Sequence, residues 1–158
     1  MLFRSRELLA GPRTLRRSFP LDEFPVYVRE GAVVPMKVSR PYTGLGDRSS
    51  EGFVTWNIYP ADGASFTQHH PEGGASTVSL KKTDAGWRIT ASGEPQPHLL
   101  RVHLENEPSA VALDGRTLEK GADWRYDGAN RRLWIRAREP LVGRDRKSTR
   151  LNSSHTVI

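Results

Sequence analysis

The side chains best suited to chemistry in this sequence are its five histidines and its paired carboxylates. His69 and His70 are adjacent, so on a strand they would point to opposite faces. His98 and His103 differ by an odd number, so they would point apart as well. No histidine pair is therefore ready to bind a metal from one strand face, and a site assembled across several strands is the alternative. The spacing favours exposed or half-buried imidazoles.

The carboxylates give a similar result. Glu105 and Glu107 flank Asn106 and could share a face, and paired carboxylates do acid–base work when their environments separate their pKa values. However, Asn106 and Pro108 are turn residues, which favours a solvated loop. The chain has no cysteine and no nucleophile-elbow, P-loop or dinucleotide-binding motif. We predict no catalytic residue, no cofactor-binding residue and no metal ligand.

Aromatic side chains are the remaining candidates for a binding site. Trp56 and Trp87 lie in phase with the apolar positions of their segments, which predicts that they belong to the core. Trp134 is out of phase with its apolar neighbours and is the best candidate for a surface aromatic. Packing against a neighbouring domain is the favoured role, and stacking on a sugar is the alternative. The candidates for such a carbohydrate or interdomain contact are Trp134, Tyr126 and Tyr59.

Short β-strands would position these side chains. Alternating apolar and polar residues, separated by Gly, Asp and Pro turns, predict strands of four to seven residues, each with one buried face. Asp114-Gly115 is a strong hairpin signal. No window shows a sustained helical period. The expected strands are two short ones at 24–29 and 32–35, separated by a kink at Gly31, and then 53–59, 64–69, 76–82, 87–91, 98–104, 111–113, 124–126 and 133–138. This pattern predicts an all-β fold, an antiparallel β-sandwich.

Composition and charge exclude two classes of partner. The 158 residues include four Trp, four Tyr and five Phe, which is enough bulky apolar surface for one core. No apolar run approaches the roughly 18 residues of a membrane span, so we expect no membrane partner. The formal charge of +6 is made up of +4 in residues 1–17 and +2 in residues 145–158. Residues 18–144 sum to zero, so we expect no nucleic-acid partner.

Both basic ends have an explanation outside the fold. The run Asp145–His155 resembles one reading frame of a common sequencing-library adapter. We therefore expect residues 143–158 to be a non-native, disordered tail, with a natural basic Ser-rich tail as the alternative. The Arg-rich start resembles a mitochondrial presequence in composition. An internal start within a longer reading frame is the favoured interpretation.

Three runs near the start of the chain form one specific pattern. Pro20-Leu21, Phe24–Arg29 and Gly31–Pro35 fit P-L-x-x-[IF]-P-V-[FY]-[VI]-R-x-G-[AS]-[IV]-[IV]-P. This pattern resembles the region that follows the catalytic barrel in glycoside hydrolase family 31, the α-glucosidase and α-xylosidase group. The resemblance identifies the chain as a C-terminal fragment of such an enzyme.

The resemblance continues less strictly to about residue 140. Val54–Phe66 is similar to the opening of the distal C-terminal β-sandwich of that family, and Val111–Gly115 and Trp124–Gly128 are similar to its last hairpins. Family members often have an acidic turn after the phenylalanine, where this chain has Thr67–Gly73. Any role of that acidic turn in ion binding therefore does not carry over.

The resemblance implies that the catalytic residues and this chain belong to different domains of the parent enzyme. The family's catalytic aspartates belong to an upstream (β/α)₈ barrel, and nothing in this chain matches their motifs. It implies a non-catalytic accessory module in a parent that is a retaining α-glycoside hydrolase, with the barrel and a proximal sandwich as partners. A carbohydrate-binding module is the alternative. The compartment stays open: cytoplasmic, periplasmic or secreted.

The resemblance also implies domain boundaries. Residues 1–40 would be the orphaned last strands of the proximal sandwich, 41–52 a linker, 53–142 the distal C-terminal sandwich, and 143–158 the tail.

Overall fold

The structure is a computed structural model that describes residues 9–12, 14–22, 26–38, 50–93 and 97–137, and the backbone of 153–157. The chain divides into two units, Met1–Glu30 and Gly31–Ile158. In the described part of the first unit, the guanidinium of Arg17 lies 5.7 Å from the centroid of the Phe19 ring. No described helix has the length and apolarity needed to cross a membrane.

The predicted strand at residues 24–29 is only partly testable. Phe24 and Pro25 lie outside the described residues, and residues 26–29 do not form a regular strand. Val26 and Tyr27 are exposed, so the β-rich composition of this run does not by itself produce a strand. A strand needs a partner for its backbone groups, and residue type alone does not provide one.

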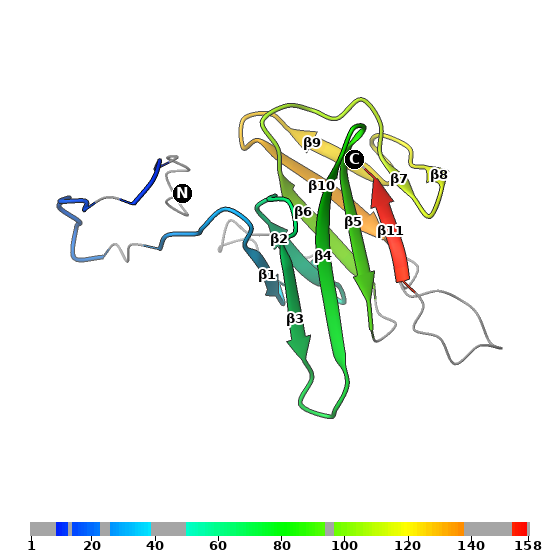
Figure 1. The fold of residues 1–158 in the computed structure, drawn as a ribbon, viewed down its shortest axis with the longest axis horizontal. Coiled ribbons are helices and arrows are strands. Elements are labelled where there is room, and N and C mark those ends of the chain that lie inside the picture. The colour runs from blue at the N-terminus through cyan, green and yellow to red at the C-terminus, as the bar shows by residue number, and fades with distance from the viewer. Residues whose placement is uncertain are drawn as a thin grey trace. The chain divides into compact units, whose positions relative to one another are not determined.

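The described residues of the second unit form strands and no α-helix. Their bounds are β1 Val33–Met36, β2 Val54–Ile58, β3 Ser65–His69, β4 Ala75–Thr83, β5 Gly86–Ser92, β6 His98–His103, β7 Ala112–Leu113, β8 Arg116–Thr117, β9 Trp124–Asp127, β10 Arg132–Ala137 and β11 Ser153–Val157 (Figure 1). The strands predicted between residues 53 and 138 are all present. Asp114 and Gly115 turn between β7 and β8 with φ of 50° and 79°, as a primed hairpin turn requires.

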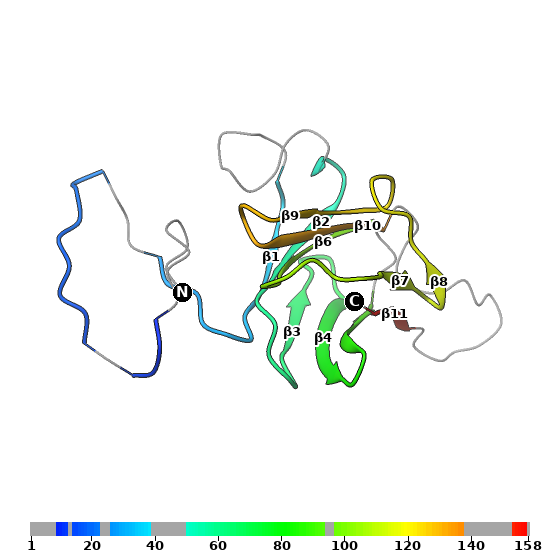
Figure 2. The ribbon, with the colours of Figure 1, turned by 90° about the horizontal axis from the view of Figure 1, so that it is seen from above.

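These strands make two sheets. One has the order β1-β2-β6-β10-β9, and the other has the order β3-β4-β5-β11-β7-β8. We call them the five-stranded and the six-stranded sheet. Seen from above, they form two layers (Figure 2). The prediction of an all-β sandwich is therefore confirmed.

The hydrophobic core fills the space between the layers. Trp56, Leu100 and Ile135 of the five-stranded sheet belong to one buried cluster with Val78 and Ile89 of the six-stranded sheet. Fully burying an aliphatic side chain of this size stabilises the fold by about 1.5–3 kcal/mol. Of the two tryptophans predicted to lie in the core, Trp56 is fully buried and Trp87 is half-buried against the cluster.

Strand β1 differs from the prediction that residues 1–40 belong to a separate, orphaned sandwich. It pairs antiparallel with β2, with Val33 opposite Ile58 and Met36 opposite Thr55. Gly31 has a φ of +80°, a conformation that glycine adopts without the strain that a side chain adds, and its N–H donates to the carbonyl of Tyr59 at 2.8 Å. Strand β1 therefore pairs with the edge of β2 and becomes part of the five-stranded sheet.

Strands β2 and β6 are paired in parallel, which the sequence did not predict for an antiparallel sandwich. The chain between them runs through β3, β4 and β5 of the other sheet before it returns. A crossover of this length permits a parallel neighbour, whereas a short hairpin does not. The remaining pairs of strands are antiparallel.

Strand β11 also differs from prediction, because the tail was expected to be disordered. Its backbone lies between β5 and β7 and pairs antiparallel with both. Without it, β5 would present a row of unpaired backbone groups, and such an edge accepts any extended segment. The Thr and Val in Ser153–Val157 favour strand conformation. The rest of the adapter-like run, residues 145–152, lies outside the described residues, as does most of the expected linker at 41–52.

Candidate functional site

The candidate site lies on the face of the five-stranded sheet that points away from the core. Strand residues alternate between faces, so the neighbours of Trp56, Leu100 and Leu133 point outward. We call this surface the arginine face. Its members are Thr55, Asn57, Leu99, Arg101, Arg125, Arg132, Trp134 and Arg136. Four of these eight residues are arginines.

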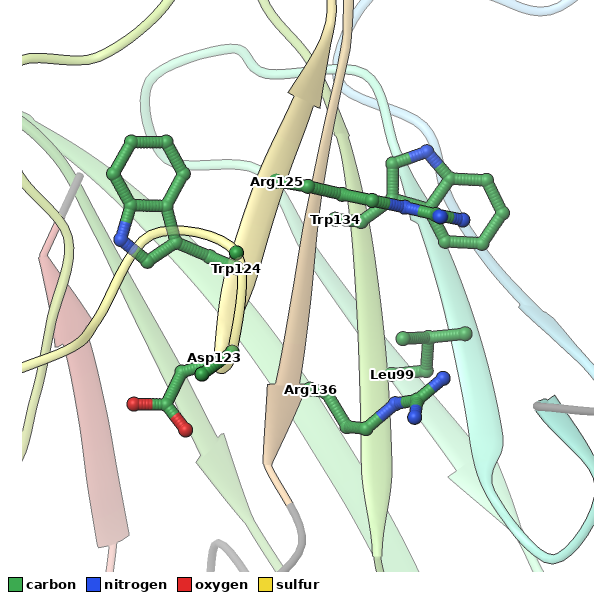
Figure 3. Close-up of a pocket in the computed structure, with 8 residues that line it drawn as sticks. Leu99, Asp123, Trp124, Arg125, Trp134 and Arg136 are labelled. Carbon is green, nitrogen blue, oxygen red and sulfur yellow. The ribbon is translucent and has the colours of Figure 1, made fainter.

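Trp134 lies at the centre of this face. It is directly opposite Arg101 on β6 and Arg125 on β9. The guanidinium carbons of the two arginines lie 4.2 and 4.8 Å from the centroid of its ring. Each distance is within the range of a cation–π interaction. Arg101 is buried and Arg125 is exposed, and Figure 3 shows the Arg125 side chain extending across the ring. A sugar that stacks on this ring would have to displace Arg125.

Arg101 is the most unusual residue of the face. It has no exposed surface, and its three guanidinium nitrogens have no hydrogen-bond partner among the described residues. Burial, together with the nearby charges of Arg132 and Arg125, lowers the pKa of Arg101 from 12.5 to about 9. The group is still cationic at neutral pH. A buried charge without a paired anion is costly, so a group of this kind calls for an explanation.

A cavity of about 140 Å³ opens beside Trp134. Its lining residues are Leu99, Gly121, Ala122, Asp123, Trp124, Arg125, Trp134 and Arg136. Figure 3 shows Arg125 and Arg136 extending to the same side as Leu99 and Trp134, whereas the carboxylate of Asp123 points away from Arg136. The Asp123 carboxylate accepts a hydrogen bond from the backbone N–H of Glu119 at 3.0 Å. The cavity thus combines two guanidinium groups with apolar walls.

The structure does not bring the three predicted aromatic residues together. Tyr59 is buried and stacks on His103 with ring centroids 4.0 Å apart, and its hydroxyl accepts a hydrogen bond from Asn57 at 3.1 Å. Tyr126 packs against the core, and its hydroxyl donates to the backbone carbonyl of Leu104 at 2.9 Å. Only Trp134 lines the cavity. The contact role of all three stays a prediction.

His98 and His103 point to opposite faces of β6, as the alternation predicted. The prediction of exposed or half-buried imidazoles is wrong for His98, which is 2% exposed, because its side chain points toward the core. His98 is opposite Ala137, which belongs to the core, and His103 is opposite Arg132 on the arginine face. The Nδ1 atom of His98 accepts a hydrogen bond from Nε1 of Trp56 at 2.8 Å, and burial lowers the pKa of His98 from 6.5 to about 4. The described residues contain no group of three or more His, Cys, Asp or Glu side chains placed to hold a metal ion.

Sequence reasoning missed the arginines of this face. Alternation places Arg101 and Arg136 opposite the apolar positions of their strands, which is a signal the sequence does contain. The same alternation normally indicates an arginine exposed to solvent. The residues around Arg101 in the sequence therefore did not predict that it would be buried.

Comparison with known proteins places this fold in context. No family model matches the chain. An α-glucosidase of Aspergillus niger is 30% identical over 118 residues, which covers 66% of this chain and 12% of that protein. An α-glucosidase of Aspergillus oryzae is 30% identical over 115 residues, which covers 64% of this chain and 11% of that protein. The chain therefore spans only a small part of the length of these curated relatives.

Solved structures share the fold at low sequence identity. A family 31 dextranase of Flavobacterium johnsoniae, solved with isomaltotriose, has a TM-score of 0.60 and 19% identity, and the match covers 87% of this chain and 20% of the dextranase. An uncharacterized protein of Listeria monocytogenes has a TM-score of 0.63 and 16% identity, with coverage of 87% and 14%.

The fold defines the class of this protein: an all-β sandwich that matches a small part of much larger chains. The resemblance that the sequence motifs indicated is confirmed by the comparisons. The chain is related to glycoside hydrolase family 31.

Proposed function

We propose that this chain is a non-catalytic accessory module of a family 31 glycoside hydrolase, and that its arginine face packs against the rest of the parent chain. The parent would hydrolyse α-glycosidic bonds with catalytic residues in its barrel. The relationship to the family and the small share of the relatives that the chain spans support this proposal. The expected partners are the upstream (β/α)₈ barrel and the proximal sandwich.

The buried charge of Arg101, which has no hydrogen-bond partner among the described residues, is the observation that carries the proposal. An outer face of an antiparallel sheet is usually solvated, as is that of the six-stranded sheet. Here Thr55, Asn57 and Arg101 are all fully buried on an outer face. Arginine and tryptophan are also enriched at protein interfaces, where they contribute much of the binding energy. These residue types therefore fit an interdomain contact better than a free surface.

The described carboxylates give no support to catalysis by the chain itself. Glu107 forms an ion pair with Lys120 at 2.6 Å, and Glu105 lies 3.4 Å from Arg131. Both glutamates are exposed, as the sequence predicted for a solvated loop. Retaining hydrolysis needs two carboxyl groups about 5–5.5 Å apart on either side of the sugar, in a site that shifts the pKa of one of them. We therefore assign the chemistry to the parent.

Recovery of the gene upstream of Met1 and past Arg144, by long-read sequencing of the source DNA, is the first test. We expect the reading frame to continue upstream into a barrel with two candidate carboxylates. A true start codon at Met1, preceded by a ribosome-binding site, would overturn the proposal.

The substitution Arg101→Met gives a second, physical test. In the chain alone it removes a buried charge and should raise the free energy of unfolding. In the parent, where a docked segment would compensate that charge through the arginine face, it should lower the Tm. Arg88→Met on the six-stranded sheet is the matched control, because Arg88 is exposed, and it should change neither. A shift of the same sign in the chain and the parent would contradict the packing role of the arginine face.

Carbohydrate binding is a second candidate, because Trp134 is half-buried and lines an open cavity. Titration of the chain with isomaltotriose, the sugar in the dextranase complex, separates the two functions. Under the accessory-module proposal, the NMR signal of the Trp134 indole N–H should not move at millimolar sugar. A saturable shift that Trp134→Ala abolishes would favour the carbohydrate-binding function instead.

A further inference from the structure

We propose that the gap between β5 and β7 is a binding site for an extended strand of the parent chain, one that carries apolar residues at alternate positions. This inference rests on the proposed function, because it takes the strand from the parent. In the structure the gap holds β11, which pairs antiparallel with β5 on one side and with β7 on the other (Figure 1). Two observations support a different occupant: other contacts hold both walls of the gap, and the residue types of β11 do not suit it.

Both walls of the gap are anchored by contacts outside β11. On one side, β5 pairs with β4 along seven residues, and Ile89 and Ala91 are buried in the core. On the other side, Val111 and Leu118 hold the β7–β8 hairpin, because both are buried in the same core. The N–H of Leu118 donates to the carbonyl of Val111 at 2.8 Å. Neighbouring strands lie about 4.8 Å apart, so the gap between these two walls takes one strand.

The register determines which positions of an occupant face the core. Directly opposed residues of neighbouring strands share a face of the sheet. Position 156 is opposite Ile89 on β5 and Leu113 on β7, and position 154 is opposite Ala91. Ile89 and Ala91 belong to the core cluster, and Leu113 packs against it. A strand that fits the gap therefore needs apolar residues at these two positions.

The sequence of the tail has the reverse pattern. Ser154 and Thr156 occupy the two core-facing positions, whereas Val157 is opposite Arg88, which is exposed. A hydroxyl group that moves from water into an apolar environment needs a hydrogen-bond partner, and an outward valine gains little from burial. Pairing through the backbone, which depends little on residue type, accounts for β11 in this place. A parent strand with apolar residues at both core-facing positions would pair in the same way and also complete the core.

Two double variants of the full chain test the register. Ser154→Val with Thr156→Ile places apolar residues at the core-facing positions, and Ser153→Val with His155→Ile places the same residue types at outward positions. We expect the first to slow hydrogen exchange of the β5 amides that face β11 at least about tenfold, because two side chains are added to the core. The second should leave exchange within about twofold of the original rate. Equal effects of the two variants would overturn the assigned register.

A free peptide tests the site itself. Thr156→Pro removes a backbone N–H and fixes φ, so in the full chain it should release β11 from the gap and expose the amides of residues 88–92 and 112–113 to exchange. The capped peptide Lys-Thr-Val-Thr-Ile-Thr-Lys should then restore their protection saturably. Unchanged amide signals of Trp56 and Ile135 show that the variant is folded. In the chain without the substitution, the peptide must displace a tethered strand, so its apparent affinity should be lower.

The matched control peptide is Lys-Thr-Thr-Val-Ile-Thr-Lys. It has the same composition, but adjacent Val and Ile point to opposite faces of a strand, so only one of them can face the core. We expect it to bind at least about tenfold more weakly, since a buried aliphatic side chain contributes about 1.5–3 kcal/mol. Equal binding of the two peptides, or binding of neither, would overturn the proposal.

Exchange of β11 between two copies of the chain is the other way to fill the gap. A dimer in light scattering of the unsubstituted chain that Thr156→Pro abolishes would overturn the parent strand as the occupant. The outcome can also be told apart from that of the proposed function. If the peptide binds but the recovered gene has a true start at Met1, the strand site is correct and the accessory-module function is wrong. If the gene continues into a barrel but neither peptide binds, the function is correct and the strand site is wrong.

Discussion

The two sheets of the sandwich differ in how far an arginine on the outer face is exposed to solvent. Arg88 on β5 and Arg101 on β6 both point to the outer face of their sheet, whereas the residues next to them along each strand point into the core. Arg88 is exposed, whereas Arg101 has no accessible surface. Strand β4 alternates between buried and half-exposed positions over most of its length, but five consecutive residues of β6 are buried. The position of a strand in the sheet, and what its neighbours cover, therefore decides whether an outward arginine meets water.

The neighbours of each arginine explain the difference. Arg101 is opposite Trp134, whose ring lies 4.2 Å from its guanidinium carbon, and β6 is the central strand of its sheet. Arg88 is opposite Lys81, a flexible and strongly hydrated side chain that keeps the surface wet. A large ring shields a charge from solvent, and an ammonium group does not. The outer face of the five-stranded sheet is thus already partly desolvated, which lowers the cost of docking a partner there.

The largest predicted effect concerns the inner face. Replacing Trp56 with Ala should destabilise the chain by about 3–5 kcal/mol, because it empties the space of a fully buried ring and leaves Nδ1 of His98 without its donor. The free energy of unfolding in urea measures the loss. Phe66→Ala is the control, because Phe66 is 40% exposed, and it should cost under about 0.5 kcal/mol. Comparable losses for the two variants would contradict the assigned core.

The next effect depends on pH. Because the folded pKa of His98 is about 4 and its ordinary value is 6.5, the unfolded chain binds the proton first as the pH falls. Stability is therefore complete above about pH 6.5 and decreases progressively down to about pH 4, by on the order of 3 kcal/mol for this group. Urea unfolding across this range measures the slope.

His98→Gln provides the matched comparison for that slope. Glutamine can still accept a hydrogen bond from Trp56 but does not titrate, so most of the loss between pH 6.5 and 4 should disappear. An unchanged slope in this variant would assign the pH dependence to other groups.

A smaller effect of opposite sign tests the arginine face. In the chain alone, Arg101→Met should raise the free energy of unfolding by about 1–2 kcal/mol, because the buried charge is lost and a flexible apolar side chain fills the space. The lost cation–π contact with Trp134 offsets part of the gain. Urea unfolding at pH 7 measures the difference, with Arg88→Met expected to be neutral. A clear loss of stability would show that the guanidinium is compensated within the chain.

The smallest effect concerns Tyr126. Its hydroxyl donates to the carbonyl oxygens of Leu104 and Glu105 at 2.9 and 3.1 Å, so Tyr126→Phe should cost about 1 kcal/mol. Thermal unfolding measures the shift, and the matched change Tyr27→Phe in the exposed part of the first unit should have little effect. A neutral Tyr126→Phe variant would leave this tyrosine available for the contact role that the sequence predicted.

Local alternation determined most of the strands. Between Val54 and Ala137, the strands, the turns and the core positions could be predicted from the sequence. The reason is that apolar and polar residues alternate along each strand, and turn residues separate the strands. The hairpin at Asp114-Gly115 was predictable for a different local reason: only a few residue types adopt a positive φ readily. The relationship to family 31 was also visible in the motif that ends at Pro35.

Only the tertiary structure decided which strands pair and which outward side chains are covered. The attachment of β1 to β2, the parallel pairing of β2 with β6, and the position of β11 between β5 and β7 all join segments that are distant in the sequence. The burial of Arg101 likewise depends on Trp134, 33 positions away on another strand. Periodicity records only which face of its own strand a side chain occupies, whereas burial depends on what other strands bring to that face.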